Sequence, residues 1–164
     1  MIIKLIKQVK GVELKEFDCG SEELNLFLKC YAQQNDKNRI GRTFVGFEKN
    51  TPVGFITLCI GSIAFNELPS NHKLPRYPIP VIRIARLGVD KSFQRKGYGK
   101  ELLGFSLEKI ALLANFIGVK FVVGDAKEEA KPFYEHYGFV PLLSKPNVLV
   151  LPIETVLKAF GNKD

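Results

Sequence analysis

Apolar and polar positions recur along the chain with periods that predict helices and strands in a mixed order. After Ser21, a favourable N-cap residue, apolar side chains recur at helical spacing at Leu24, Phe27, Leu28 and Tyr31. We therefore expect a helix that begins after Ser21 and buries this stripe in the core. The opening residues 1–11 mix lysines into an apolar run, which is typical of an edge strand.

The next pattern is rich in β-branched and aromatic residues. Residues 42–63 contain two such runs separated by the turn-forming tetrapeptide KNTP at 49–52, so we expect an antiparallel hairpin. Four prolines then interrupt residues 67–80, namely Pro69, Pro75, Pro78 and Pro80. They predict irregular structure, either an ordered surface loop beside a site or a simple connector.

The second half of the chain alternates strand and helix signals. We expect a helix whose Pro132 lies in the first turn and which Gly138 closes. The expected elements, in order, are a strand at 81–89, a helix at 96–116 that ends by Gly118, a strand at 119–126, a short helix at 128–139 and a strand at 147–153. This order predicts a mixed α/β fold, and the length suits a single domain over 1–164.

Hydrophobic runs, cysteine spacing and net charge exclude some classes of protein. An uninterrupted apolar run long enough for a membrane span is missing from the sequence, which predicts a cytoplasmic protein. Cys19, Cys30 and Cys59 are widely spaced and lack neighbouring ligands, so neither a disulfide framework nor a metal site is expected. The net charge of +7 favours anionic partners, although the same excess also serves plain solubility.

The segment 94–100, QRKGYGK, stands between a strand signal and a helix signal. A helix start has unpaired backbone amides and a partial positive charge, which together suit a phosphate. Gly97 and Gly99 allow close backbone approach, and Arg95, Lys96 and Lys100 add positive charge. The segment is neither a Walker A loop nor a complete dinucleotide fingerprint.

The wider stretch 89–103, VDKSFQRKGYGKELL, resembles the coenzyme A signature of the GNAT N-acetyltransferases. In that signature a valine is followed after four residues by Q/R-x-x-G-x-G/A, here Val89, Gln94, Gly97 and Gly99. The stretch 130–142, AKPFYEHYGFVPL, resembles a later motif of the same superfamily. The resemblance implies a GNAT fold, with a mixed central β-sheet, splayed parallel strands and flanking helices.

Further segments resemble one branch of that superfamily, the toxins that acetylate aminoacyl-tRNA and are encoded beside a small antitoxin. They are residues 17–35, 42–47, 74–90 and 124–142, and the resemblance extends over about 10–152. It implies acetyl-CoA as the donor, the α-amino group of aminoacyl-tRNA as the acceptor, an antitoxin partner and a homodimer.

The resemblance also implies where the donor binds. Strands 83–89 and 120–126 splay, the backbone of Leu87, Gly88 and Val89 pairs with the pantetheine arm, and residues 94–100, including Tyr98, hold the phosphates. Phe133 is expected to pack on the coenzyme.

Tyr134 matches the position of the superfamily's general acid. A phenol stays protonated at neutral pH and donates to the leaving sulfur. Tyr137 lies three residues later and is the rival acid, whereas His136 and His72 are expected to be solvated side chains. No general base stands out, which favours an acceptor amine of low pKa, such as an α-amine, over a lysine side chain.

An RNA acceptor needs phosphate contacts, and the candidates are Lys37, Arg39, Arg42, Arg76, Arg83 and Arg86. Two other hypotheses stay open at this point. One is a GNAT enzyme that acts on a small amine, an antibiotic or a protein N-terminus. The other is a non-catalytic coenzyme A binder that has kept the fold.

Overall fold

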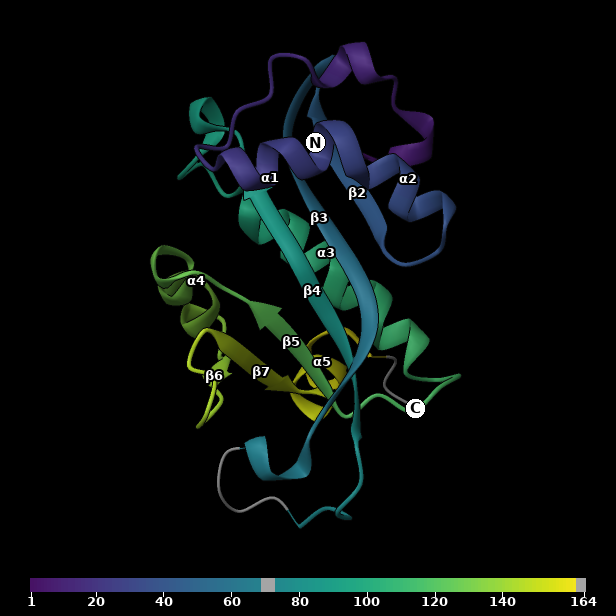
Figure 1. The fold of residues 1–164 in the computed structure, drawn as a ribbon, viewed down its shortest axis with the longest axis vertical. Helices are drawn as coiled ribbons and strands as arrows, with labels where there is room; N and C mark the ends of the chain where they lie inside the picture. The colour runs from purple at the N-terminus through teal and green to yellow at the C-terminus, as the bar shows by residue number, and fades with distance from the viewer. Residues whose placement is uncertain (69–72, 162–164) are drawn as a thin grey trace. The chain divides into compact units, whose positions relative to one another are not determined.

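A computed structural model describes residues 1–68 and 73–161 of the protein (Figure 1). The strands in this part of the chain are β1 (Ile2–Leu5), β2 (Arg42–Glu48), β3 (Thr51–Ile63), β4 (Ile79–Val89), β5 (Phe121–Asp125), β6 (Val140–Pro141) and β7 (Val148–Pro152). The α-helices are α1 (Glu22–Leu26), α2 (Ala32–Lys37), α3 (Tyr98–Leu113), α4 (Lys131–His136) and α5 (Ile153–Phe160). Pro69 and His72, which the sequence places in a loop, lie outside the described residues.

Strand pairing follows the order β1-β2-β3-β4-β5-β7-β6. The β1–β2, β2–β3, β5–β7 and β6–β7 pairs are antiparallel, whereas β4 and β5 are parallel. This confirms the expected mixed sheet and the hairpin of β2 and β3. The edge strand expected over residues 1–11 is present only as β1, because a 3-10 turn follows at Ile6–Gln8. The parallel pairs run from Val81 with Phe121 to Ile84 with Gly124. The splay of these strands beyond Ile84 stays a prediction.

The chain forms two compact units, each made of two segments. Unit 1 comprises Met1–Cys59 and Ala85–Ser106, and unit 2 comprises Ile60–Ile84 and Leu107–Asp164. Because β3, β4 and α3 each pass from one unit into the other, the division does not follow the order of the chain.

In unit 1, successive residues of the hairpin face different helices. Phe55 on β3 stacks with Phe27 of the first helical segment at 6.3 Å between ring centroids. Its neighbour Gly54 lies against Leu102 of α3, because a Cβ there would be 2.8 Å from the Leu102 side chain. Since side chains alternate across a strand, the two helical segments cover opposite faces of β3.

The expected helix after Ser21 is present, and the Ser21 hydroxyl accepts the Leu24 N–H at 3.3 Å. Between α1 and α2 it widens into a π-helical turn, Phe27–Tyr31, in which the Ala32 N–H bonds to the Phe27 carbonyl. This turn shifts the helical phase, so that Ala32 is buried and Tyr31 is 54% exposed. The prediction that Tyr31 belongs to the buried stripe is therefore wrong.

Unit 2 has its own core around β5, formed by the buried residues Ile63, Leu68, Ile79, Val81, Phe121, Val123, Leu142 and Val150. Two elements of this unit differ from the expectation. Strand β4 begins at Ile79, so it includes Pro80, which the sequence places in the loop. The last strand ends at Pro152, and α5 follows with Ile153 and Val156 buried.

The helices of the described residues lack the length and apolar character that a membrane crossing requires. Likewise, these residues contain no group of three or more histidine, cysteine or carboxylate side chains that is arranged to hold a metal ion. Cys19, Cys30 and Cys59 are free thiols.

Candidate active site

The expected phosphate-binding segment, residues 94–100, lies in unit 1 at the start of α3. The Glu101 N–H bonds to the Gly97 carbonyl at 3.1 Å, which makes Gly97 the N-cap residue of α3. The amides of Tyr98, Gly99 and Lys100 precede this first closed turn, so they have no partner within the helix. Together with the helix dipole, these amides form an anion-binding surface.

The turn before α3 has an unusual backbone. Arg95 and Gly97 both adopt positive φ, 61° and 89° respectively. Glycine adopts this region without steric cost, but an L-residue such as Arg95 is strained there by about 1–2 kcal/mol. The conformation at Arg95 must therefore be held by contacts made elsewhere.

Positive charge gathers at the same turn. Arg95, Lys96 and Lys100 are exposed. The Lys96 ammonium lies 5.6 Å from the Phe93 ring centroid. No described carboxylate forms an ion pair with Arg95 or Lys100. A phosphate at this turn would therefore meet cations that are not already neutralised.

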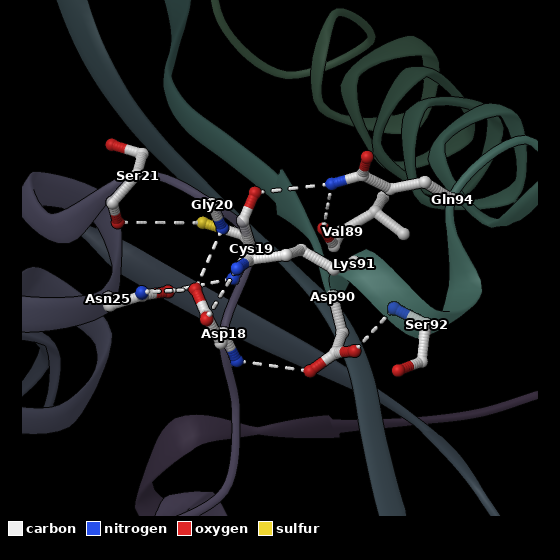
Figure 2. A network of polar contacts seen from close by, with 10 residues as sticks. All are labelled: Asp18, Cys19, Gly20, Ser21, Asn25, Val89, Asp90, Lys91, Ser92 and Gln94. Atoms are coloured by element: carbon white, nitrogen blue, oxygen red, sulfur yellow. Dashed lines mark hydrogen bonds and ion pairs between the residues drawn. The ribbon is translucent and has the colours of Figure 1, made fainter.

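Two of the predicted coenzyme residues have structural partners. The Gln94 side-chain N–H donates to the Val89 carbonyl at 2.9 Å and to the Cys19 carbonyl at 3.1 Å (Figure 2). Gln94 thus fixes the turn at the end of β4.

Tyr98 packs edge-on against Phe93 at 5.8 Å, and its pKa is raised by desolvation and by the charge of Glu48. Leu87 and Val89 are half-buried and Gly88 is buried on β4.

The candidate acid Tyr134 lies on α4 in unit 2, and its side chain is 2% exposed. Its ring lies against β5 at Gly124, where an added Cβ would be 2.7 Å from Tyr134 Cε1. Phe133 and Phe139 pack edge-on against the ring at 5.4 and 5.1 Å. Gly124 thus provides the space that this aromatic cluster occupies.

Burial first, and then the negative charge of Asp125, raise the pKa of Tyr134 above its ordinary value. The phenol therefore stays protonated throughout the physiological range. No side chain or backbone group in the described part of the chain hydrogen-bonds to its hydroxyl. This hydroxyl is a proton donor available to a ligand.

The rival Tyr137 is less enclosed than Tyr134. It is the C-cap residue of α4 and is half-buried, with its ring 5.2 Å from Phe133 and 4.9 Å from His136. His136 is exposed, as expected from the sequence. Its deeper burial distinguishes Tyr134 from Tyr137 as the candidate acid.

The predicted RNA contacts fall into two groups. Lys37, Arg39 and Arg76 are exposed, and Arg76 also lies 6.0 Å from the Phe65 ring centroid. The other three are held by protein groups. Arg42 pairs with Asp36 at 2.9 Å, Arg83 with Asp125 at 2.6 Å, and the Arg86 guanidinium stacks 3.8 Å from the centre of the Phe27 ring.

The chain matches the acetyltransferase (GNAT) domain family over residues 39–141, more than half of its length. The chain belongs to the GNAT acetyltransferase family. A probable toxin TacT of Sinorhizobium fredii is 32% identical over 158 residues, which cover 88% of this chain and 87% of that protein. A tRNA-acetylating toxin of Mycobacterium tuberculosis is 29% identical and covers 92% of both chains.

Solved GNAT structures resemble this chain closely. The toxin AtaT in complex with acetyl-methionyl-tRNA superposes with a TM-score of 0.87 at 28% identity, over 97% of this chain and 98% of that chain. A tyrosine-to-phenylalanine variant of AtaT, bound to the C-terminus of the antitoxin AtaR and to acetyl-CoA, has a TM-score of 0.80 at 25% identity, over 98% of each chain. The fold expected from the sequence resemblance is thus confirmed.

Sequence reasoning missed the residues that support the site. Asp18, Asn25, Asp90 and Lys91 surround the Gln94 turn, yet they lie in two segments far apart in the chain (Figure 2). Gly124 was read only as part of a strand. A glycine within an apolar β-branched run is a signal for close approach of another group, and here that group is Tyr134.

Proposed function

We propose that this GNAT protein transfers the acetyl group of acetyl-CoA to the α-amino group of aminoacyl-tRNA and, as a toxin, blocks translation in the cytoplasm. The observation that carries the proposal is the similarity to a tRNA-acetylating toxin over 92% of both chains. The charged turn before α3 and the buried phenol of Tyr134 support the same chemistry from within the structure.

The residues of unit 1 fit a coenzyme that carries phosphates. The free amides at the start of α3, the exposed Arg95 and Lys100, and the left-handed Gly97 would hold the pyrophosphate. The backbone of Leu87, Gly88 and Val89 would align the pantetheine arm, as an added strand would. When bound, acetyl-CoA supplies an acetyl thioester, which is activated toward attack by an amine.

Tyr134 is the proposed general acid. Its hydroxyl would donate a hydrogen bond, and then its proton, to the sulfur that leaves as the C–S bond breaks. The raised pKa keeps the phenol protonated at every physiological pH, so its O–H is present to donate to the negative charge that develops on the leaving sulfur. Phe133, packed on Tyr134, would border the coenzyme.

The acceptor nitrogen must be unprotonated to attack the thioester carbonyl. An α-amino group has a pKa of about 7.7 to 8.0, and an adjacent ester lowers it, so much of the amine is neutral at pH 7 to 8. Such an acceptor needs little help from a general base, and solvent water takes the proton released as the amide forms. The low pKa of its α-amine therefore favours aminoacyl-tRNA over a lysine side chain as the acceptor.

The tRNA backbone would be bound by basic side chains. Lys37, Arg39 and Arg76 are exposed and suit phosphate contacts, while Arg86 is half-buried and stacks on Phe27. Arg42 and Arg83 would act together with the carboxylates that they already bind. We also propose an antitoxin partner whose acidic segment binds basic side chains of this protein, and a homodimer.

The test is a transfer assay with labelled acetyl-CoA and a total pool of aminoacylated tRNA, with uncharged tRNA as the control. We expect label on charged tRNA only. If acetyl-CoA binds but charged tRNA stays unlabelled, the tRNA acceptor is wrong, and small amines, antibiotics and peptide N-termini are the acceptors to screen. Binding without turnover on any of these acceptors would indicate a non-catalytic coenzyme A binder.

A further inference from the structure

A polar network joins the loop before α1 to the turn that follows β4 (Figure 2). Asp18 is at its centre. Asp18 Oδ1 accepts the Gly20 N–H and the Asn25 side-chain N–H, both at 2.9 Å. The Asn25 Oδ1 in turn accepts the Cys19 N–H at 2.9 Å. Asn25 belongs to α1, so this part of the network fixes residues 18–20 on that helix.

The second part of the network extends from Asp18 to the end of β4. The Asp18 N–H donates to Asp90 Oδ2 at 3.0 Å, and the Asp18 carbonyl accepts the Lys91 N–H at 2.8 Å. Asp18 Oδ2 also pairs with the Lys91 ammonium at 3.1 Å. The backbone and side chain of Asp18 thus bind both Asp90 and Lys91, two successive residues of the turn.

The third part of the network extends to Gln94, the residue before Arg95. The Cys19 carbonyl accepts the Gln94 side-chain N–H, which also binds the Val89 carbonyl. Arg95, the next residue, has the positive φ that an L-residue avoids. Strain of this kind persists only where surrounding contacts over-determine the backbone. Residues 18 and 19 supply such contacts from a distant segment. Asp90 adds local ones, because it accepts the Ser92 and Phe93 N–H groups.

We propose that Asp18 is a positioning residue for the coenzyme, one that sets the phosphate-binding turn through Lys91 and Gln94 without touching the donor. The inference rests on the proposed function, since it takes residues 94–100 as the phosphate site. Asp18 itself is about half exposed and is acidic, so it does not bind phosphate. Its hydrogen bonds, that from Asn25 first, lower its pKa to about 2, and the carboxylate is therefore charged at every working pH.

Charge and geometry predict opposite outcomes for the same substitution. Asp18→Ala frees Lys91 and makes the turn more positive, so an electrostatic role alone predicts tighter binding of acetyl-CoA. A positioning role predicts weaker binding, because the turn relaxes toward an unstrained backbone. The sign of the change therefore separates the two roles.

The experiment measures the KM for acetyl-CoA and the kcat at saturating charged tRNA, together with calorimetric binding of coenzyme A. We expect Asp18→Ala to raise the KM and the dissociation constant about tenfold while kcat stays within about twofold. Asp18→Asn keeps an acceptor oxygen for Gly20 and Asn25, so it should recover part of the affinity. Unchanged or tighter binding in Asp18→Ala would overturn the proposal.

Two controls separate the network from general effects. Glu13→Gln removes a carboxylate that accepts the Lys10 N–H at 2.7 Å in the same unit but lies outside the network, and we expect its KM to match the wild type. Lys91→Met removes a positive charge but leaves the Asp18–Lys91 backbone bond, so its KM should rise less than that of Asp18→Ala. A larger rise in Lys91→Met would show an electrostatic role instead.

The outcomes also distinguish this inference from the proposed function. If the wild-type protein neither binds coenzyme A nor transfers acetyl groups, the proposed function is wrong, and the inference is wrong with it. A second outcome is that the wild type binds coenzyme A and transfers acetyl groups, and that Asp18→Ala does so with the same KM and dissociation constant. If the thermal unfolding curve shows that this variant is folded, the proposed function stands and the positioning role is wrong.

Discussion

The two regions that carry the proposed chemistry are built on opposite physical principles. The turn before α3 in unit 1 is exposed and polar, and it acts through backbone amides, cations and two left-handed residues. The Tyr134 site in unit 2 is buried and aromatic, and it acts through a phenol whose pKa burial has raised. Binding of an anion tolerates water, whereas a proton donor gains from its exclusion.

This contrast has a consequence for substitutions. The binding turn depends on backbone conformation, so changes there should alter the affinity for acetyl-CoA. The Tyr134 site depends on close packing, so changes there should alter turnover or stability.

The largest effect should come from Tyr134→Phe. Loss of the proton donor should lower kcat by about 100-fold or more, because general acid catalysis contributes this much. Binding of acetyl-CoA should stay within about twofold, since the ring and its packing remain. Steady-state transfer and calorimetry measure the two quantities. Tyr137→Phe is the matched control, and a larger loss of kcat in that variant would identify Tyr137 as the acid.

Gly124→Ala should be the next most damaging substitution. The added Cβ would lie 2.7 Å from Tyr134 Cε1 and 3.0 Å from its Cζ, so the buried ring must move. We expect a loss of about 1–3 kcal/mol in the free energy of unfolding, as for other overpacked cores, with lower kcat.

Denaturant unfolding checks this value, and Gly104→Ala serves as the control. Gly104 is on α3 and a Cβ there meets nothing within 4 Å. The control should gain about 0.5–1 kcal/mol, because alanine favours the helix interior. A neutral Gly124→Ala would show that β5 and Tyr134 are not tightly packed.

Gly97→Ala should affect the binding turn through its backbone. Gly97 has φ of 89° and a Cβ there meets nothing within 4 Å, so the cost is conformational strain and not a clash. We expect a loss of about 1–2 kcal/mol in unfolding free energy and a raised KM for acetyl-CoA. Gly97→Asn should lose less, since asparagine tolerates this region. Equal losses in both variants would rule out backbone strain as the cause.

The smallest effect is expected in the pH profile. Transfer should rise with pH as the acceptor amine loses its proton, and should then stay level to about pH 10, the ordinary pKa of a phenol. A raised pKa means that Tyr134 keeps its proton to higher pH than a free phenol, so its ionisation removes activity only above that range. A falling limb below pH 9 that is lost in Tyr134→Phe would contradict this assignment.

The amino-acid sequence alone predicts the order of most elements and the chemical nature of the binding turn. Local patterns carry this information: alternation for the hairpin, Ser21 for a helix start, and glycines between basic residues for the turn before α3. The backbone amides and charges of residues 94–100 are neighbours in the chain, so their chemistry can be recognised without a fold.

Only the tertiary structure decided the environment of the catalytic candidate and the support of the binding turn. The burial of Tyr134 depends on Gly124 of another element. The turn depends on Asp18, which pairs with Lys91, and on Cys19, whose carbonyl accepts the Gln94 side-chain N–H, and both contacts join segments distant in sequence. The π-helical turn that exposes Tyr31 is likewise a phase shift that apolar spacing does not predict. A sequence pattern reports local periodicity and charge, whereas burial, strain and pKa arise from contacts that only folding brings together.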